Sequence, residues 1–302
     1  MTKSFKSGFV AVMGRPNVGK SSLVNRMVGE KVAIVSPKPQ TTRNRISAIL
    51  TTENYQVVFE DTPGMHKPRS PLARFMQKSW ESAASGTDVA LAVIDGSDGL
   101  TPADLDVLRN LQKLDCPVFV AVNKTDDAKP ERVMPALSAL SELGFLAEII
   151  PVSARTGENV PLLLEKLISA LPEGEKYYPD GELTDKSERF MASEIVREKV
   201  LQLFQQEIPH GVGVTVEKFY FDSEKNLHEI DAVIVCEKAS HKPMLIGKGG
   251  AALKKVGSLA RPELERLTGT KVYLTLWVKV KEGWRDSDNL LRQLGYDSKR
   301  DL

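Results

Sequence analysis

The stretch GRPNVGKS at residues 14–21 is the feature that most narrows what this chain can fold into. It fits the phosphate-loop spacing G-x-x-x-x-G-K-[ST]. Glycines at both ends let backbone amides turn inward around phosphate oxygens, Lys20 can reach the β- and γ-phosphates, and the Ser21 hydroxyl can take one Mg²⁺ position. We therefore predict a nucleoside triphosphate site made of Gly14, Arg15, Pro16, Asn17, Val18, Gly19, Lys20, Ser21 and Ser22.

Short β-branched runs alternate with helix-like stretches through the first half of the chain. The runs lie at 9–13, 45–50, 55–60, 89–95, 117–123 and 148–152. They are continuously apolar rather than alternating, as expected of strands covered by helices on both faces. The first run leads into the phosphate loop and a helical pattern at 21–28 leaves it, so a helix N-terminus would face the anion. We predict an α/β fold with a mostly parallel, doubly wound sheet.

The composition changes at 172–187, where PEGEKYYPDGELTDKS replaces periodicity with proline, glycine and charge. Beyond it the order is helix (189–206), strand (212–222), strand (228–237), glycine loop (247–250), helix (251–267) and strand (271–280), followed by a tail with a helical turn or two. This order predicts a smaller α+β domain. We expect domains at 1–172 and 189–302, with a linker at 173–188.

The bulk composition is that of a soluble globular protein. Hydrophobic residues make up 41% of the 302 residues, and the net charge of +1 gives no overall field that favours nucleic acid or membrane. Cys116 and Cys236 sit in apolar runs and are expected to be buried free thiols. The sequence begins without the apolar region of a signal peptide, and no run is long enough to span a bilayer. We expect a cytoplasmic protein.

The stretch Asp61-Thr62-Pro63-Gly64 follows the predicted strand 55–60. There Asp61 can hold Mg²⁺ through water, and the Gly64 amide can contact a γ-phosphate and lose that contact on hydrolysis. A Pro-Gly turn after a strand is the alternative explanation. The neighbouring phosphate loop favours the nucleotide interpretation.

Two further stretches predict a guanine site. Asn123-Lys124-Thr125-Asp126 ends a buried strand, where Asp126 can accept hydrogen bonds from guanine N1–H and the N2 amine, two bonds worth roughly 3–6 kcal/mol over adenine. Asn123 can tie the segment to the phosphate loop, and the stem of Lys124 can cover the base. Ser153-Ala154-Arg155 follows the last strand, and its Ala154 amide can meet guanine O6. A charged loop with a helix cap is the plainer alternative.

These motifs resemble the G1, G3, G4 and G5 boxes of translation-factor-class GTPases over about residues 8–172. The stretch Pro39-Gln40-Thr41-Thr42-Arg43 resembles the G2 switch box. The resemblance implies that Thr42 closes onto Mg²⁺ in the GTP state, although the sequence leaves Thr41 open. Lys20, Thr42, Asp61 and Gly64 are then the catalytic set, with Ser21, Thr42 and Asp61 (through water) at the metal.

Met65 follows the Asp61–Gly64 stretch, and many small GTPases carry a water-orienting glutamine at this position. Methionine cannot polarise water, so we expect slow hydrolysis without a partner, on the order of 10⁻⁴–10⁻² s⁻¹. Some relatives with an asparagine at the position of Asn17 hold K⁺ near the phosphates. A K⁺ cofactor beside Mg²⁺ is therefore a hypothesis, against the alternative that Asn17 only suits the loop's backbone.

The second domain carries a G-x-x-G loop at residues 247–250, a loop type that brings backbone close to a nucleic-acid strand. The stretch 238–262 contains six basic residues and no acidic one, which favours phosphate. The fold order resembles a type II KH domain. The predicted RNA-binding residues are Lys242, Ile246, Gly247, Lys248, Gly249, Gly250, Lys254 and Lys255. A plain helix-start turn with solvated lysines is the alternative, and single-stranded DNA stays open as a ligand.

The combination of GRPNVGKSSLVN, PQTTR, DTPG, NKTD, SAR, HKPMLIGKGG and WRDSDNLLRQLGY resembles the Era family of GTPases over nearly the whole chain. The resemblance implies binding to the 3′ end of small-subunit ribosomal RNA, a role in maturing that subunit, and loose association with the inner membrane. The competing hypothesis is a membrane-associated or cell-cycle signalling GTPase whose C-terminal domain binds a protein or lipid. We expect GTP and GDP as ligands and a monomer as the default.

Overall fold

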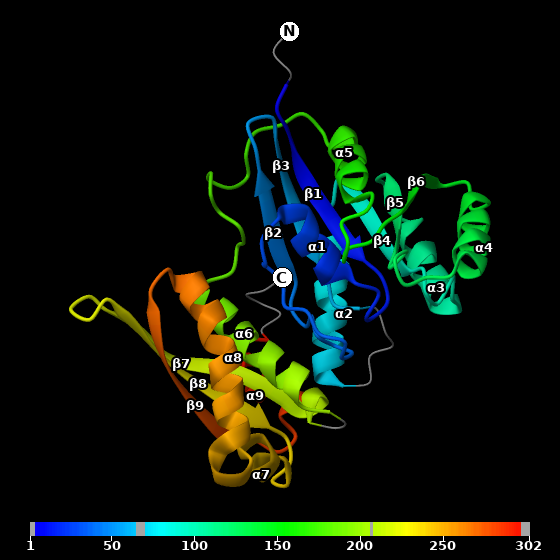
Figure 1. Ribbon diagram of the computed structural model, residues 1–302. Coiled ribbons are helices and arrows are strands. Elements are labelled where there is room, and N and C mark those ends of the chain that lie inside the picture. Colours follow the sequence, from blue (N-terminus) through cyan, green and yellow to red (C-terminus); the bar gives the residue numbers. More distant parts are fainter. Residues whose placement is uncertain (1–3, 65–69, 206–207, 297–302) are drawn as a thin grey trace.

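The computed structural model describes residues 4–64, 70–205 and 208–296, which form two sheets with their covering helices (Figure 1). The larger sheet has the order β2-β3-β1-β4-β5-β6 and the smaller one β7-β8-β9. In the larger sheet all pairs are parallel except the edge pair β2–β3. Its strands are β1 (Lys6–Met13), β2 (Ile46–Thr51), β3 (Tyr55–Asp61), β4 (Val89–Asp95), β5 (Val118–Asn123) and β6 (Leu146–Pro151). The mostly parallel sheet agrees with the prediction.

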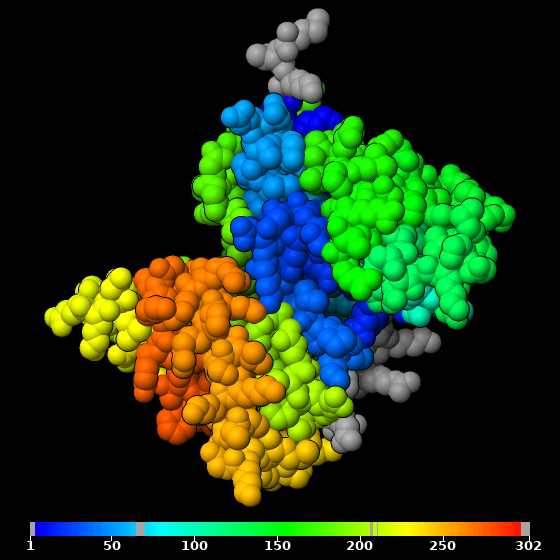
Figure 2. Space-filling model, viewed as in Figure 1, coloured from blue at the N-terminus to red at the C-terminus, as the bar shows by residue number. Residues whose placement is uncertain are grey.

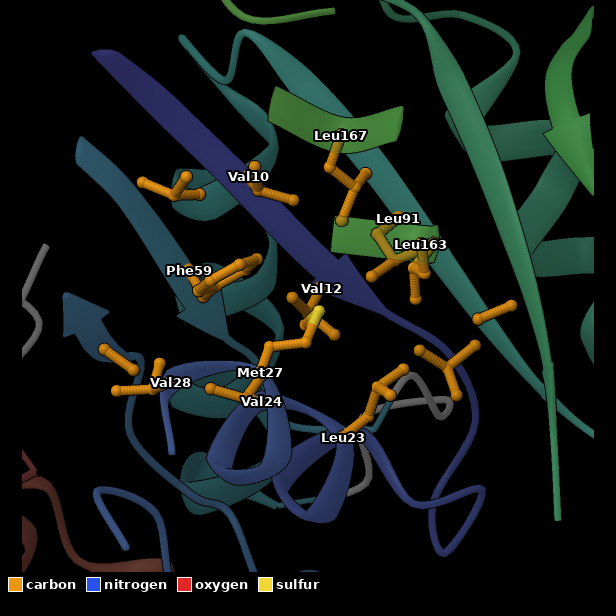
Figure 3. Packing of buried hydrophobic residues seen from close by; sticks show 14 of the residues in the cluster. Val10, Val12, Leu23, Val24, Met27, Val28, Phe59, Leu91, Leu163 and Leu167 are labelled. Carbon is orange, nitrogen blue, oxygen red and sulfur yellow. The ribbon is translucent and has the colours of Figure 1, made fainter. Parts of the chain in front are cut away.

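Helices cover both faces of this sheet, because successive residues of a strand point to opposite sides. Val10 and Val12 of β1 face α1 (Lys20–Val28) and α5 (Val160–Ala170), in the cluster shown in Figure 3. Ala11 and Met13 point the other way, into a second cluster formed with α2 (Pro71–Ala84), α3 (Pro102–Leu111) and α4 (Pro130–Ser141). Burial on both faces explains why the strands are continuously apolar.

The smaller unit contains a helix that the sequence prediction missed. Its elements are α6 (Glu188–Leu203), β7 (Val212–Asp222), β8 (Leu227–Cys236), α7 (His241–Ile246), α8 (Ala251–Thr268) and β9 (Lys271–Val280). The glycine loop therefore follows α7 and not strand β8 directly. Six residues with a proline inside are too short for a periodic signal, so α7 could not be recognised from its pattern.

The predicted linker pairs with the edge of the larger sheet. Ala48 of β2 forms an isolated bridge with Thr184, and the Ile49 amide donates to the Leu183 carbonyl at 2.9 Å. The buried Gln56 side chain donates to the Tyr178 carbonyl at 2.8 Å. The segment therefore covers backbone groups that an edge strand otherwise leaves open.

A shared apolar cluster joins the two units. It combines Leu72, Phe75 and Met76 of α2 with Val233, Val235, Trp284, Leu291, Leu294 and Tyr296. The last four belong to the predicted tail, which folds as η3 (Trp284–Asp286) and α9 (Asp288–Gln293) with the residues that follow. Trp284 has no exposed surface, and its Nε1–H donates to the Gly211 carbonyl at 3.0 Å. The tail is thus part of the contact between the units.

Two expectations from composition can be compared with the structure. Cys116 and Cys236 are free thiols; Cys236 is buried, whereas Cys116 is only half-buried. Within the described ranges, no helix combines the length and the apolar character needed to cross a membrane.

We expect Trp284→Ala to lower the free energy of unfolding by about 3–5 kcal/mol, because it leaves a cavity in the shared cluster and an unpaired carbonyl. Denaturant titration measures the change. Trp277→Ala is the control, since Trp277 lies 58% exposed on β9 and should cost less than about 1 kcal/mol. Equal losses for the two variants would contradict the packing described for the cluster.

Candidate nucleotide site and glycine loop

The phosphate loop lies at the C-terminal end of β1 and depends on its glycines. A Cβ on Gly14 would approach the Val93 carbonyl oxygen to 2.5 Å, and one on Gly19 (φ +97°) would approach Asn123 Nδ2 to 2.3 Å. The buried Lys20 donates from Nζ to the carbonyls of Gly14 and Arg15 at 3.2 and 3.1 Å. Burial lowers the pKa of Lys20 to about 8; Asp61 opposes this shift and Arg15 adds to it. The loop is therefore shaped to receive negative charge next to a lysine that lacks a full counter-charge.

Three oxygens that suit a hard cation converge beside the loop. Ser21 Oγ lies 2.6 Å from Asp61 Oδ2, and Thr42 Oγ1 lies 3.2 Å from the same oxygen and 3.0 Å from Ser21 Oγ. Asp61 Oδ1 is buried and has no hydrogen-bond partner among the described residues. Burial raises the pKa of Asp61, with Lys20 opposing it. Hydroxyl and carboxylate oxygens around an unsatisfied buried carboxylate fit Mg²⁺.

The two adjacent threonines make different contacts. Thr41 Oγ1 turns away and donates to the Lys38 carbonyl at 2.6 Å, whereas Thr42 faces Ser21 and Asp61. Only Thr42 lies with the other two predicted metal ligands.

The turn after β3 packs directly on the phosphate loop. Thr62 Oγ1 donates to the Val12 carbonyl at 2.8 Å, and Pro63 is buried. A Cβ on Gly64 would come within 2.6 Å of Pro16 N. This close approach puts the Gly64 backbone beside the loop that would hold the phosphates. Met65, on which slow hydrolysis was predicted, lies outside the described residues.

The predicted base-binding residues meet at the far end of the same groove. Asn123 Nδ2 donates to the Val18 carbonyl at 2.9 Å, and Asn123 Oδ1 accepts from the Ala154 amide at 2.9 Å. The amide expected to meet guanine O6 is therefore engaged by Asn123 in this structure. Cavities of about 460 and 400 Å³ share Gly19, Ser22 and Lys124, which makes the groove continuous from phosphate to base end.

Asp126, at the base end, accepts hydrogen bonds from Ser153 Oγ and from the Arg155 guanidinium. The Ser153 bond is the main cause that lowers the pKa of this carboxyl, with Arg155 adding to it, so Asp126 is ionised at neutral pH. The Arg155 side chain is 74% exposed, so a base can displace it at little cost.

Two predicted residues lie differently from what a direct phosphate contact requires. The Arg15 side chain turns outward to Asp98 at 2.6 Å and Asp104 at 3.2 Å, which leaves only its backbone toward the groove. Asn17 has φ +66°, and its Nδ2 donates to the Pro37 carbonyl at 3.0 Å. Asn17 thus connects the phosphate loop to the segment of the G2 box.

Sequence reasoning missed Asp95. Its carboxylate, at the end of β4, accepts a hydrogen bond from Lys124 Nζ, which also donates to the Asn17 carbonyl at 2.8 Å. Ser97 Oγ also donates to this carboxylate, at 2.6 Å. Partial burial acts to raise the pKa of Asp95, but the hydrogen bonds from Lys124 and Ser97 outweigh it and lower that pKa. The sequence did contain a signal for its role at the site, because Asp95 is a carboxylate at the C-terminal end of a predicted parallel strand.

The glycine loop connects α7 to α8. Gly247 has φ +76°, and a Cβ there would come within 2.7 Å of Ala252 Cβ; Gly249 and Gly250 also have positive φ. Lys248 is exposed at its tip, and Lys242, Lys254 and Lys255 are exposed around it. Ile246 and Leu253 are half-buried beside the loop, whereas Leu245 lies wholly in the core.

This fold and site define a GTP-binding P-loop protein with a KH domain behind its nucleotide domain. Family models match in the same places: 50S ribosome-binding GTPase at residues 9–124 and KH domain at residues 207–285. The chain is 49% identical to GTPase Era of Clostridium kluyveri (strain NBRC 12016) over 96% of this chain and 99% of that protein. It is 48% identical to GTPase Era of Clostridium botulinum (strain Kyoto / Type A2) over 97% and 98%.

Two solved structures match with a TM-score of 0.93 over 97% of this chain and 99% of theirs. One is Era in complex with MgGDPNP and nucleotides 1506–1542 of 16S ribosomal RNA, at 38% identity. The other is a variant of Aquifex aeolicus Era bound to GDP·AlF₄⁻, at 37% identity. The chain belongs to the Era family of GTPases and is itself a GTPase.

The low pKa of Lys20 gives a pH dependence with a defined sign. Phosphates need the charged ammonium, and a lysine with a pKa of about 8 loses its proton as the pH rises, so GDP affinity should fall about tenfold between pH 7 and 9. Lys20→Arg keeps its charge over this range and should show a flatter profile. Fluorescence titration with labelled GDP measures the affinity of both proteins across this pH range. If the two affinities fall in parallel, the pH dependence does not come from Lys20.

Proposed function

We propose that this protein is a GTP-operated switch that hydrolyses GTP slowly, binds single-stranded RNA at the 3′ end of small-subunit ribosomal RNA, and assists maturation of the small ribosomal subunit. The observation that carries the proposal is the groove in which phosphate loop, metal oxygens and base-end carboxylate lie in the order of a bound GTP. The solved relative that holds MgGDPNP and a 16S ribosomal RNA segment supports both ligands. The proposed domains are 1–172 and 189–302, joined by 173–188.

In the proposed mechanism the phosphate loop and Lys20 hold the β- and γ-phosphates. Ser21, Thr42 and, through water, Asp61 would hold Mg²⁺, which neutralises phosphate charge when bound. The Gly64 amide contacts the γ-phosphate, so loss of that phosphate releases the segment after β3. Positioning and charge supply the rate enhancement in this scheme.

The K⁺ hypothesis belongs to the same site. Asn17 reaches across from the phosphate loop to the Pro37 carbonyl, so a monovalent cation here would have oxygen ligands from both segments. Equal hydrolysis rates in K⁺ and Na⁺ would exclude a K⁺ cofactor.

RNA binding is assigned to the loop at 247–250 and the lysines around it. The exposed positive charges attract the sugar-phosphate chain, and the glycines allow its close approach. The G2 segment, residues 31–45, includes the G2 box and contacts the KH unit, so RNA and GTP should each increase the affinity for the other. Titration of a GTP analogue with and without RNA copying the 3′ end of small-subunit ribosomal RNA tests this. Affinity that does not depend on nucleotide would contradict the coupled switch.

Asp126→Asn should abolish the preference for guanine. The amide keeps one acceptor for N1–H but turns a donor toward the N2 amine, so GDP affinity should fall about 100-fold or more, while xanthosine diphosphate, with oxygen at C2, should gain. Competition binding measures both nucleotides. Asp115→Asn, an exposed carboxylate away from the groove, is the control. An unchanged guanine preference would refute the base-end assignment.

Lys248→Glu should weaken RNA binding about tenfold and lower its salt dependence, because it replaces a positive charge at the loop tip with a negative one. Lys271→Glu is the matched control, since its side chain is 81% exposed on β9 away from the loop. Filter binding over a salt series measures the effect. Equal losses in the two variants would indicate a general charge effect and argue against an RNA site at the loop.

A further inference from the structure

Helix α6 of the KH unit lies against the nucleotide domain (Figure 2), and its charged side chains contact residues of the G2 segment, both in the G2 box and in the stretch just before it. Arg197 donates from Nη2 to the Thr41 carbonyl. Glu198 Oε1 accepts from the Val35 amide at 2.8 Å, and its Oε2 pairs with Lys31 at 2.6 Å. Arg197 and Glu198 are almost completely buried, so these contacts are made out of water.

The Thr41 carbonyl is one end of the peptide unit that continues into Thr42. A peptide unit is planar and trans, so its C=O and N–H point in opposite directions. When Arg197 holds the carbonyl toward α6, the Thr42 amide must point away from α6, on the side of its own domain. The orientation of the metal-facing residue is thus coupled to an arginine of the other domain.

The residue on the other side of Thr42 is held in the same way. Arg43 is 2% exposed, donates to the Val212 carbonyl at 2.8 Å, and lies 5.5 Å from the ring centre of Trp284 and 5.9 Å from that of Tyr296. Thr42 is therefore bracketed by two anchors in the KH unit, while its own hydroxyl faces Ser21 and Asp61.

Arg197 is itself fixed before it meets the segment. Glu194, one helical turn earlier, accepts from Arg197 Nε at 2.7 Å and from Nη2 at 2.5 Å. This fork sets the plane of the guanidinium, so one orientation of Arg197 is available to the Thr41 carbonyl.

We propose that Arg197 is a positioning residue for the metal ligand Thr42, so that the KH domain completes the GTP-bound state of the nucleotide site within the same chain. The inference rests on the proposed function, because it requires Thr42 to close on Mg²⁺ when GTP is bound. The KH domain then favours GTP over GDP through the backbone of residue 41, without touching the nucleotide.

The test is the ratio of affinities for GDPNP and GDP in the full chain with Mg²⁺. Arg197→Lys keeps a charge beside Glu194 but loses the planar fork. It should weaken GDPNP binding by about 10- to 100-fold, the range expected for one hydrogen bond to a charged group, and leave GDP binding within about twofold. Arg189→Ala is the matched control, an exposed arginine of the same helix that contacts Glu217. It should change neither affinity.

A second variant distinguishes loss of the positioning role from a simple failure to fold. E194M/R197M replaces both buried charges with apolar side chains of similar length, which folded proteins often tolerate. It should show the same loss of GDPNP preference. It should also show faster amide hydrogen exchange in residues 36–45 with GDPNP bound. Equal losses for GDP and GDPNP would mean a merely structural role and would overturn the inference.

Thr42→Ala separates this inference from the proposed function. If Thr42→Ala lowers GDPNP preference and the Arg197 variants do not, the switch stands and the positioning role falls. If Thr42→Ala itself leaves the ratio unchanged, closure through Thr42 is refuted, and the proposed switch mechanism with it.

Discussion

Parallel strand pairing determines where the loops of the nucleotide site can lie. Because β1, β3, β4, β5 and β6 run in the same direction, the segments that follow their C-terminal ends meet along one edge. Residues separated by more than a hundred positions, such as Val18 and Asn123, become hydrogen-bonded neighbours there. The order of the strands across the sheet then sets the order of the groove, with the phosphate loop between the metal oxygens of β3 and the base end at β5 and β6.

The second organising feature is charge buried between the domains. Arg43, Arg197 and Glu198 would each be costly to remove from water alone, and each is held by opposite charge, a carbonyl or an aromatic face. Such contacts add little net stability compared with apolar packing, but they tolerate few alternative geometries. They therefore make the position of the G2 segment sensitive to the position of α6, which is a requirement for a switch whose state is transmitted to a second domain.

The sequence predicted the strands and the GTPase domain well, because doubly covered strands are continuously apolar and phosphate loops have a fixed spacing. It could not choose between Thr41 and Thr42, since the difference between them is which hydroxyl the folded chain turns toward Ser21 and Asp61. The sequence did not predict that Arg197 is buried. The hydropathy of a polar helix face is the same whether that face is exposed to solvent or buried in an interface. Helix α7 is too short to produce a recognisable helical periodicity in the sequence. The pairing of the linker with the sheet edge uses backbone groups, which every residue has, so the sequence does not mark it.

The linker's pairing with β2 also fixes how far the KH domain can travel. The Asp185 carboxylate still accepts from the Ser47 amide at 3.3 Å, and α6 begins at Glu188. Three residues span about 10 Å at full extension. While that pairing holds, the KH domain can pivot about a point beside β2 but cannot drift from it. Helix α6 is therefore tethered beside the G2 segment at a high effective concentration. Any opening of these contacts would be reversed in an intramolecular step whose rate is independent of protein concentration.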